Sequence, residues 1–513
     1  MTTELYNTIT PGERWLITVV VMAATLMQVI DTTIVNVALP HMQGALSASP
    51  DEITWTLTSY LVASAIFMPL TGYLSDRLGR KSYLFISIAG FTIVSALCGA
   101  SVTLTELVVF RLLQGVFGAA LVPLSQAIMT DIFPPEERTR AMAIWGIGVM
   151  VGPILGPTLG GYLTDIASWR WTFYVNIPVG IFTLLLMNVI PDTPKKSRRL
   201  DWIGLLLICT SIGGLQYVID RGNSVDWFAS SSIQFATYLT ITCFLGFIVH
   251  QFSDLHERIF DLSIFKDKNF AISSMMLCIV GLGLYGTMVM QPLMMENLLN
   301  YPVLTTGLLL APRGLSGMVS MIVVTQLAKH VDPRWIILSG IGICTAGIWI
   351  GTYYSLNINI FWLVWPMILQ GFGMGMIFVP LSTIAFSTLS HHLRTEAAGL
   401  YSLLRTIGGS IGISVAITVF TRRSQVFWNE LGGGINPYNP ALHQFLQPLH
   451  LSPYKIPGTA ILTTELMQQS SMLAFVNVFA FIAWAFLLMA PLVLLLDKGK
   501  KKVPDQVIVE EEP

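Results

Sequence analysis

The chain has 513 residues, of which 53% are hydrophobic and only 11% are charged. Soluble domains carry about 25% charged residues, so this composition excludes a soluble enzyme and indicates a protein embedded in a lipid bilayer. The formal net charge of −1 lacks the basic excess of a nucleic-acid-binding surface, so no nucleic-acid partner is expected. The five cysteines form no CxxC pair and the eight histidines no HExxH pattern, which predicts neither a disulfide framework nor a metal site.

Apolar runs of about 18 residues or more, long enough to cross a bilayer, recur along the chain. Six candidate spans form a first half over residues 1–190, and two more form an insert within residues 191–268. Six further spans lie within residues 269–496, and residues 497–513 are expected to form a charged, solvated cytoplasmic tail. The fourteen predicted spans are 15–39, 53–71, 82–101, 105–128, 141–163, 172–190, 202–219, 233–250, 270–292, 304–327, 335–354, 361–383, 397–420 and 471–496.

The distribution of Lys and Arg over the loops predicts the orientation of the chain. If successive loops lie on alternate sides, 20 of the 28 Lys and Arg residues share the side of the N-terminus, five lie opposite and three lie within spans. Cytoplasmic loops carry such an excess of basic residues. Both termini are therefore expected to be cytoplasmic.

The sequence repeats itself at a spacing of 256 residues. Leu113-Gln114-Gly115 recurs as Leu369-Gln370-Gly371, and Gly152 recurs as Gly408. Two parallel halves related by an axis along the membrane normal produce such a repeat. The sequence therefore predicts an all-α membrane fold of two six-helix halves with two inserted helices.

A tight, basic turn, Gly-Tyr-Leu-Ser-Asp-Arg-Leu-Gly-Arg-Lys at residues 72–81, joins the second and third predicted spans. We expect it at the cytoplasmic face. Gly72 and Gly79 are expected to adopt backbone angles closed to other residues. Asp76 is expected either to cap the following helix or to pair with one of the two nearby arginines. The alternative is an ordinary basic loop.

Two ionisable residues lie inside predicted spans of the first half, Asp31 in the first span and Arg111 in the fourth. A charge in hydrocarbon is costly, so such residues are functional by default. We expect Asp31 to carry a proton and Arg111 to favour the ionised form of a nearby carboxylate. The alternatives are a helix-packing role for Asp31 and extension of Arg111 to the membrane interface.

The fifth predicted span carries glycines at four-residue spacing, Gly148, Gly152, Gly156 and Gly160. Such glycines share one helix face and let another helix approach closely. Pro153 in the same stretch is expected to bend the helix. The pattern alone does not separate a functional role from plain helix packing.

Other polar residues at or near membrane depth are candidates for a substrate cavity. Glu296 and Arg313 are expected either to contact substrate or protons or to lie at span ends. The Met, Phe and Trp content would suit a large, adaptable apolar pocket. The cavity candidates are Asn36, Gln114, Glu296, Arg313 and Arg405.

Residues 421–470 are predicted to form a long loop on the outer, periplasmic side. The segment includes Gly432-Gly433-Gly434 and Asn436-Pro437-Tyr438-Asn439-Pro440. Long loops in compact proteins are usually functional or disordered, and the sequence leaves both open.

These motifs resemble those of the fourteen-span drug:proton antiporters of the major facilitator superfamily. Residues 72–81 are similar to its signature loop, 107–115 to its proton-coupling motif, 148–161 to its antiporter motif, and the surroundings of Asp31 to its first-span motif. In the second half, Asp332 stands without the glycines and basic run of a second signature loop. By this resemblance, proton coupling falls to Asp31 and Arg111, and gating to Gly72, Asp76, Arg77, Gly79 and Arg80.

The resemblance implies a proton-driven exporter of hydrophobic or amphipathic drug-like compounds, without catalytic residues or cofactor. Similar pumps of the bacterial inner membrane work with a periplasmic adaptor and an outer-membrane channel, so residues 421–470 would face the adaptor. No GxxxxGK[ST] sequence is present, so ATP use by this chain is not expected. The alternatives are an exporter of a narrow substrate such as fatty acids or bile salts, an importer, and a non-transporting membrane sensor.

Overall fold

The computed structural model describes residues 9–48, 50–53, 55–193, 195, 201–222, 225–251, 262–390, 393–436, 439–449 and 456–497. Helices are the only regular elements in these ranges. Twelve of them are long and apolar enough to cross a membrane. All fourteen predicted spans fall on helices, the other two being α8 and the shorter α9–α10 pair.

The helices follow the predicted division of the chain. The first half contains α1 (Pro11–Ala45), α2 (Pro50–Ile53), α3 (Trp55–Phe67), α4 (Thr71–Leu78), α5 (Arg80–Ala100), α6 (Leu104–Gly118), α7 (Leu121–Ile132), α8 (Arg138–Ile166), α9 (Trp171–Tyr174) and α10 (Asn176–Leu185). The insert contains α11 (Trp202–Gly222) and α12 (Ser231–Gln251). The second half contains α13 (Lys268–Asn297), α14 (Val303–Leu327), α15 (Pro333–Ile350), α16 (Ile360–Ser387), α17 (Arg394–Gly432), α18 (Pro440–Leu446) and α19 (Ile456–Leu495).

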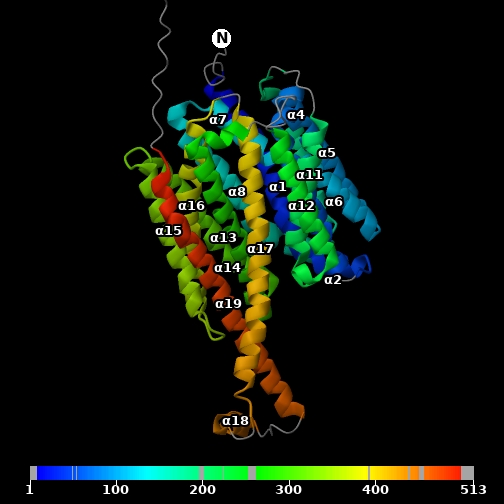
Figure 1. Ribbon diagram of the computed structural model, residues 1–513, viewed down its shortest axis with the longest axis vertical. Coiled ribbons are helices and arrows are strands. Elements are labelled where there is room, and N and C mark those ends of the chain that lie inside the picture. The colour runs from blue at the N-terminus through cyan, green and yellow to red at the C-terminus, as the bar shows by residue number, and fades with distance from the viewer. Residues whose placement is uncertain are drawn as a thin grey trace, which may run out of the picture.

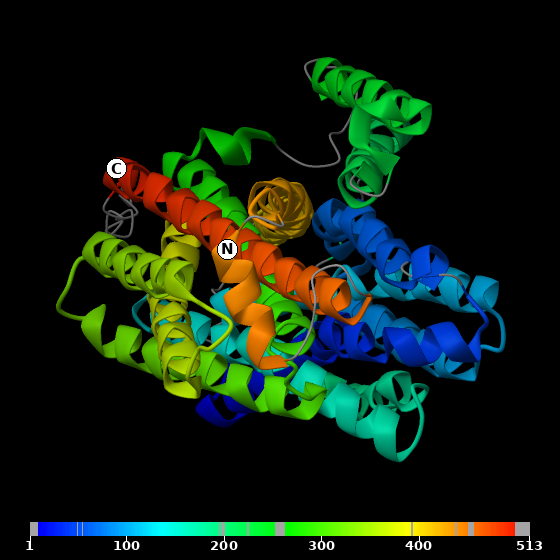
Figure 2. The same cartoon turned by 90° about the horizontal axis from the view of Figure 1, so that it is seen from below.

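Helix packing repeats between the halves. In the first half α1 packs on α8 and α5 on α6, and in the second half α13 packs on α17 and α15 on α16. The halves meet where α8 packs on α14 and where α17 packs on α4 and α7. Figure 2 shows α17 end-on between the two halves. The repeated packing agrees with the internal sequence repeat.

The inserted helices stand at the side of the bundle. Helix α11 packs on α3 and also contacts α17. Gln216 of α11 donates to Ser410 Oγ of α17 at 2.7 Å, which ties the insert to the second half. Helix α12 packs mainly on α11 and projects away from the halves in Figure 2.

The segment 421–470 is largely helical, so the prediction of a long loop was wrong. Helix α17 runs 39 residues to Gly432 and α19 runs 40 residues from Ile456, each about 60 Å long at 1.5 Å per residue. No Gly or Pro interrupts residues 421–431, and Pro457 lies in the first turn of α19, where proline is tolerated. With α18, these helix ends form a stalk that projects from the bundle in Figure 1.

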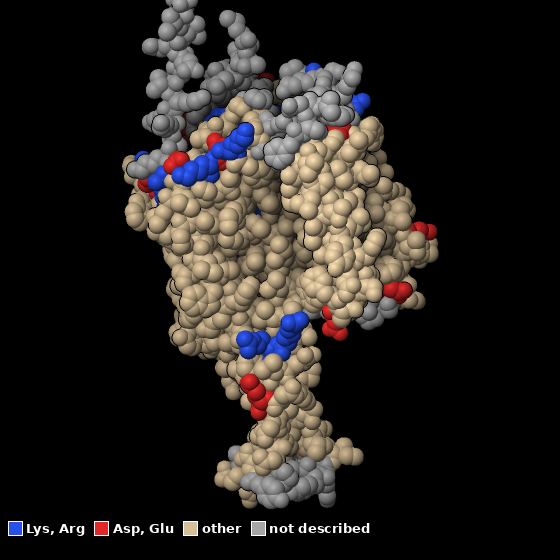
Figure 3. All heavy atoms as spheres, in the orientation of Figure 1, with Lys and Arg blue, Asp and Glu red and all other residues tan. Residues whose placement is uncertain are grey.

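The chain enters and leaves the bundle at one end, opposite the stalk (Figure 1). At that end Asp497 N–H donates to Asn269 Oδ1 at 2.8 Å, which joins the end of α19 to the start of α13. Figure 3 shows Lys and Arg gathered at this end and where the stalk leaves the bundle, with mostly uncharged surface between them. Such a surface fits a multi-pass membrane protein.

Candidate functional site

The two charged residues predicted inside the first half form a buried ion pair. Arg111 Nη1 lies 2.6 Å from Asp31 Oδ2, and the two side chains are 1% and 0% exposed. Arg111 Nε also donates to Thr56 O at 3.0 Å, and its guanidinium lies 4.3 Å from the ring centroid of Tyr60. Arg111 therefore points into the helix bundle and does not extend to the membrane interface.

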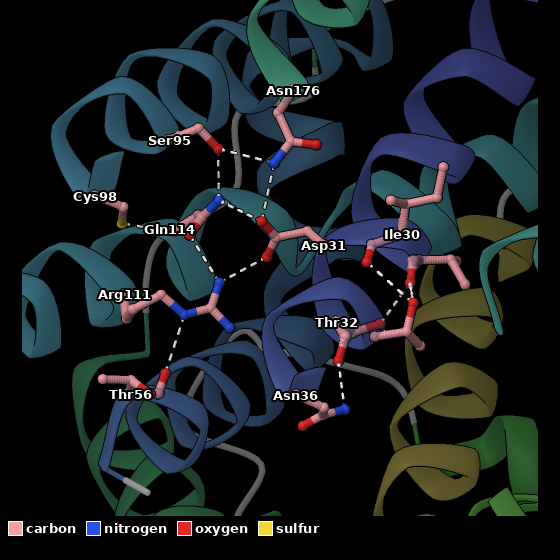
Figure 4. A network of polar contacts seen from close by, with 12 residues as sticks. Ile30, Asp31, Thr32, Asn36, Thr56, Ser95, Cys98, Arg111, Gln114 and Asn176 are labelled. Atoms are coloured by element: carbon pink, nitrogen blue, oxygen red, sulfur yellow. Dashed lines mark hydrogen bonds and ion pairs between the residues drawn. The ribbon is translucent and has the colours of Figure 1, made fainter. Parts of the chain in front are cut away.

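Neutral side chains complete the coordination of Asp31 (Figure 4). Gln114 Nε2 and Asn176 Nδ2 each donate to Asp31 Oδ1 at 2.9 Å. The same two groups donate to Ser95 Oγ at 2.6 and 3.1 Å, and Gln114 Oε1 accepts from Arg111 Nη1 at 2.8 Å. Asp31 thus accepts hydrogen bonds from three side chains on two other helices, Arg111 and Gln114 on α6 and Asn176 on α10.

Of the predicted cavity residues in the first half, the structure brings only Gln114 to this network. The exposed Asn36 donates from Nδ2 to Thr32 O of its own helix at 3.3 Å. Sequence reasoning missed Ser95 and Asn176, although Asn176 is a polar residue inside the predicted sixth span. Its position inside an apolar run was the available signal.

The second half contains a separate polar network around Arg313. Arg313 Nη1 donates to Gln291 Oε1 at 2.9 Å, and its Nη2 donates to Thr287 Oγ1 at 2.8 Å. Gln291 Nε2 donates to Gln370 Oε1 at 3.0 Å, and Gln370 Nε2 to Gly347 O at 3.2 Å. Arg313 therefore lies within α14, not at a span end.

The remaining cavity candidates lie apart from this network. Glu296 is partly buried at the C-terminal end of α13. Arg405 is buried on α17, and its Nε has no hydrogen-bond partner in the described part of the chain. Neither residue makes an ion pair with a described residue.

The predicted glycine face of α8 packs against α1. A Cβ built on Gly148, Gly152, Gly156 and Gly160 would overlap Met22, Val29, Thr33 and Ile34 of α1, respectively. Thr33 Oγ1 also donates to Gly152 O at 3.1 Å across this contact. Pro153 lies within the helical backbone of α8. These glycines fix α1, and so Asp31, against the helix that borders the second half.

At the end of the bundle that carries the termini, one buried carboxylate joins the two halves. Asp131 of α7 accepts from Arg394 Nη1 at 2.9 Å and also pairs with Arg80 Nη1. Arg80 starts α5, and Arg394 starts α17 of the second half. We call Asp131, Arg80 and Arg394 the inter-half latch. Sequence reasoning missed Asp131, although its charge stands directly after an apolar span.

The two glycines of the signature loop serve different purposes. Gly79 has φ +84°, as predicted for a residue that must be glycine. Gly72 lies within α4, so the expectation of an unusual backbone angle was wrong there. A Cβ on Gly72 would lie 2.8 Å from Cα of Glu396, so glycine is needed for the close approach of α4 and α17.

Arg80 and Arg77 of the signature loop make further hydrogen bonds. Arg80 N–H donates to Thr193 Oγ1 at 2.9 Å, and the N-cap residue of α5 is Gly79, which has no side chain to cap the helix. Arg77 is exposed and donates from Nη1 to Tyr73 Oη at 2.9 Å, whereas Asp76 is partly buried.

The sequence model of the Major Facilitator Superfamily matches residues 21–413 of this chain. The chain belongs to the major facilitator superfamily. Membership agrees with the two repeated halves, and it places the protein among transporters rather than enzymes. The fold is also similar to that of a proton:xylose symporter, XylE, with a TM-score of 0.61 and 13% sequence identity over 95% of this chain and all of that one.

Two curated superfamily members resemble the chain over nearly its whole length. The probable multidrug resistance protein EmrY of Escherichia coli is 33% identical over 490 residues, 94% of this chain and 96% of EmrY. The multidrug export protein EmrB of Escherichia coli is 33% identical over 485 residues, 93% of this chain and 94% of EmrB. The resemblance to multidrug exporters drawn from the motifs is confirmed.

Proposed function

We propose that this protein exports hydrophobic or amphipathic drug-like compounds by drug:proton antiport across the inner membrane of a bacterial cell, with both termini in the cytoplasm. The observation that carries this proposal is the buried Asp31–Arg111 pair at 2.6 Å, in a chain similar to multidrug exporters along its length. A buried ionisable group in a membrane protein marks a proton or substrate pathway by default.

The mechanism follows from the neutralisation of Asp31. A proton from outside removes the charge that Arg111, Gln114 and Asn176 stabilise, so the packing of α1, α6 and α10 around Asp31 loosens. The two halves then rock about the expected substrate cavity between them. The inter-half latch of Asp131, Arg80 and Arg394 opens or closes the cytoplasmic side. Drug binding from the cytoplasm favours release of the proton inside and re-forms the Asp31–Arg111 pair.

The membrane potential provides enough energy for this cycle. Each elementary charge moved inward gains about 2.3 kcal/mol per 100 mV. About 1.4 kcal/mol corresponds to a tenfold concentration ratio. One proton per cycle therefore supports a gradient of a neutral substrate of some tens-fold at a potential of about 100 mV.

The proposed coupling is tested by dye accumulation in energised cells that carry the protein, with and without an uncoupler. We expect lower accumulation in these cells, abolished both by the uncoupler and by Asp31→Asn. Asp165→Asn, the same change at an exposed position near the end of α8, is the matched control and should export normally. Uncoupler-sensitive export that survives in Asp31→Asn would refute the assignment of Asp31.

We propose further that the stalk contacts an EmrA-like periplasmic adaptor, which leads to an outer-membrane channel. In support, the stalk extends beyond the bundle and carries an apolar hollow of about 400 Å³ between α17, α18 and α19, with Leu431, Phe445 and Leu462 in its lining. Phe445→Asp should abolish resistance in cells while leaving transport in inverted vesicles intact. Equal resistance of the variant and the parent would contradict the contact.

A further inference from the structure

The second half contains a cation that no described carboxylate neutralises. Arg313 donates only to the neutral side chains of Gln291 and Thr287, and it makes no ion pair with any Asp or Glu in the described ranges. An unpaired charge at membrane depth costs several kcal/mol. The site therefore gains stability from any anion that can reach Arg313.

The neighbours of Arg313 hold it in one orientation. Gln291 turns its oxygen toward Arg313 because its amide nitrogen donates to Gln370, which is in turn held by the backbone oxygen of Gly347. Gln291, Thr287 and Gln370 are buried, whereas Arg313 is only partly buried. A guanidinium has five N–H donors, and the network uses two of them. Arg313 thus keeps three N–H donors that no described residue uses, and part of its surface remains exposed.

Arg313 lies on the helix that borders the other half. Two close approaches mark the contact between α14 and α8. A Cβ on Gly307 of α14 would lie 2.8 Å from Thr158 Oγ1 of α8, and a Cβ on Gly146 of α8 would lie 2.9 Å from Met321 Sδ of α14. Arg313 falls between residues 307 and 321 of α14. It is therefore at a depth where α14 lines the junction of the two halves, and a transporter that rocks its halves must carry substrate along that junction.

The internal repeat indicates what is missing beside Arg313. Thr287 on α13 stands 256 residues after Asp31 on α1, and Gln370 stands 256 residues after Gln114. In the first half the aspartate neutralises an arginine, whereas in the second half the equivalent position contacts an arginine but carries no charge. A ligand carboxylate would complete the second network as Asp31 completes the first.

We propose that Arg313, oriented by Thr287 and Gln291, binds the carboxylate headgroup of an amphipathic anionic substrate. The planar fork of a guanidinium matches a carboxylate with two parallel hydrogen bonds. The unpaired positive charge also disfavours a cationic headgroup at the same place. The inference rests on the proposed export function and names the class of substrate.

Three ligands with the same apolar chain test this proposal: dodecanoate, its neutral methyl ester and dodecyltrimethylammonium. Their binding to the purified full chain in nanodiscs is measured by quenching of tryptophan fluorescence. Thr287→Asp introduces an internal carboxylate beside Arg313, and Thr287→Asn introduces a neutral side chain of nearly equal shape. The readout is the ratio of the affinities for dodecanoate and dodecyltrimethylammonium.

We expect Thr287→Asp to lower this ratio at least about tenfold, equivalent to about 1.4 kcal/mol, and Thr287→Asn to leave it within about threefold. Arg313→Gln should lower the ratio as Thr287→Asp does. An unchanged ratio in Thr287→Asp and Arg313→Gln, or an equal fall in Thr287→Asp and Thr287→Asn, would overturn the proposal. Export of a neutral dye by the unaltered protein is measured separately, so failure of export and failure of anion binding are distinguished.

Discussion

The two halves of the molecule place polar networks on corresponding helices but balance their charges differently. In the first half, Asp31 and Arg111 neutralise each other at 2.6 Å among neutral donors. In the second half, Arg313 is surrounded by neutral oxygen atoms of Thr287 and Gln291. The same scaffold thus holds a closed acid–base pair in one half and an open cation in the other.

This difference separates two tasks that an antiporter must couple. A closed ion pair responds to a proton, because protonation removes the charge on which the pair depends. An open cation responds to a ligand of opposite charge, because the ligand supplies the missing partner. The comparison therefore supports the two proposals, proton binding in the first half and headgroup binding in the second, and variants can test each of them.

The largest effect is expected from breaking the closed pair. Arg111→Gln leaves Asp31 buried without its cation and should cost about 3–5 kcal/mol. Arg313→Gln loses two hydrogen bonds but also relieves the burial of a charge without a described counter-ion, so its stability should stay within about 1 kcal/mol of the parent's. Thermal unfolding of the purified proteins measures both. The double variant Asp31→Asn/Arg111→Gln should recover much of the lost stability but not transport. Equal losses in the two single variants would remove the distinction between the halves.

A smaller effect is expected at the inter-half latch, where Arg80 and Arg394 share Asp131. Hydrogen bonds to a charged group contribute about 1.5–3 kcal/mol each. Asp131→Asn replaces the two charge-assisted hydrogen bonds of Asp131 by weaker neutral ones and loses part of that stabilisation. The end of the bundle that carries the termini should then open at least about tenfold more often. Alkylation of a cysteine placed at the buried Ser402, in a chain without its native cysteines, measures the opening. If the Asp131→Asn variant is alkylated no faster than the protein that keeps Asp131, the proposed latch is contradicted.

The smallest effects are expected at the glycine contacts, which also differ between the halves. A Cβ on Gly412 would overlap backbone atoms of Leu282, whereas one on Gly156 would overlap mainly the Thr33 side chain. Side chains can move more easily than helix backbone, so Gly412→Ala should cost about 1 kcal/mol and Gly156→Ala less than that. Melting temperatures of the two variants decide the order, and the reverse order would show that α1 is held more rigidly than α13.

Much of the fold could be predicted because membrane spans are recorded locally in the sequence. All fourteen predicted spans fall on helices, and even 202–219 with Gly213-Gly214 and 304–327 with Pro312 are helical. The stalk was mistaken for a loop because its glycine and proline clusters mark only its turns. Helices α17 and α19 continue past the apolar runs, and burial of Leu442, Leu446 and Leu462 helps to close the tip.

Parts of the site could be predicted in the same way. Asp31 and Arg111 stood out because a charge within an apolar run is visible in the sequence alone, and Gly79 stood out within a tight turn. Ser95, Asn176 and Asp131 did not, because neutral polar residues are common in spans and a charge at a span end is ordinary. Their importance comes from partners on other helices, 19 to 263 positions away along the chain.

The sequence by itself determined the membrane class, the positions and order of the fourteen helical spans, the repeat of two halves and the charged positions inside them. Each of these follows from hydrophobic length, loop charge or residue spacing, which are properties of short segments. Only the tertiary structure decided that Arg111 meets Asp31, that Arg313 meets no described carboxylate, and that Asp131 joins the halves. Such pairings depend on how helices distant in the chain pack and rotate against one another, and no single segment contains that information.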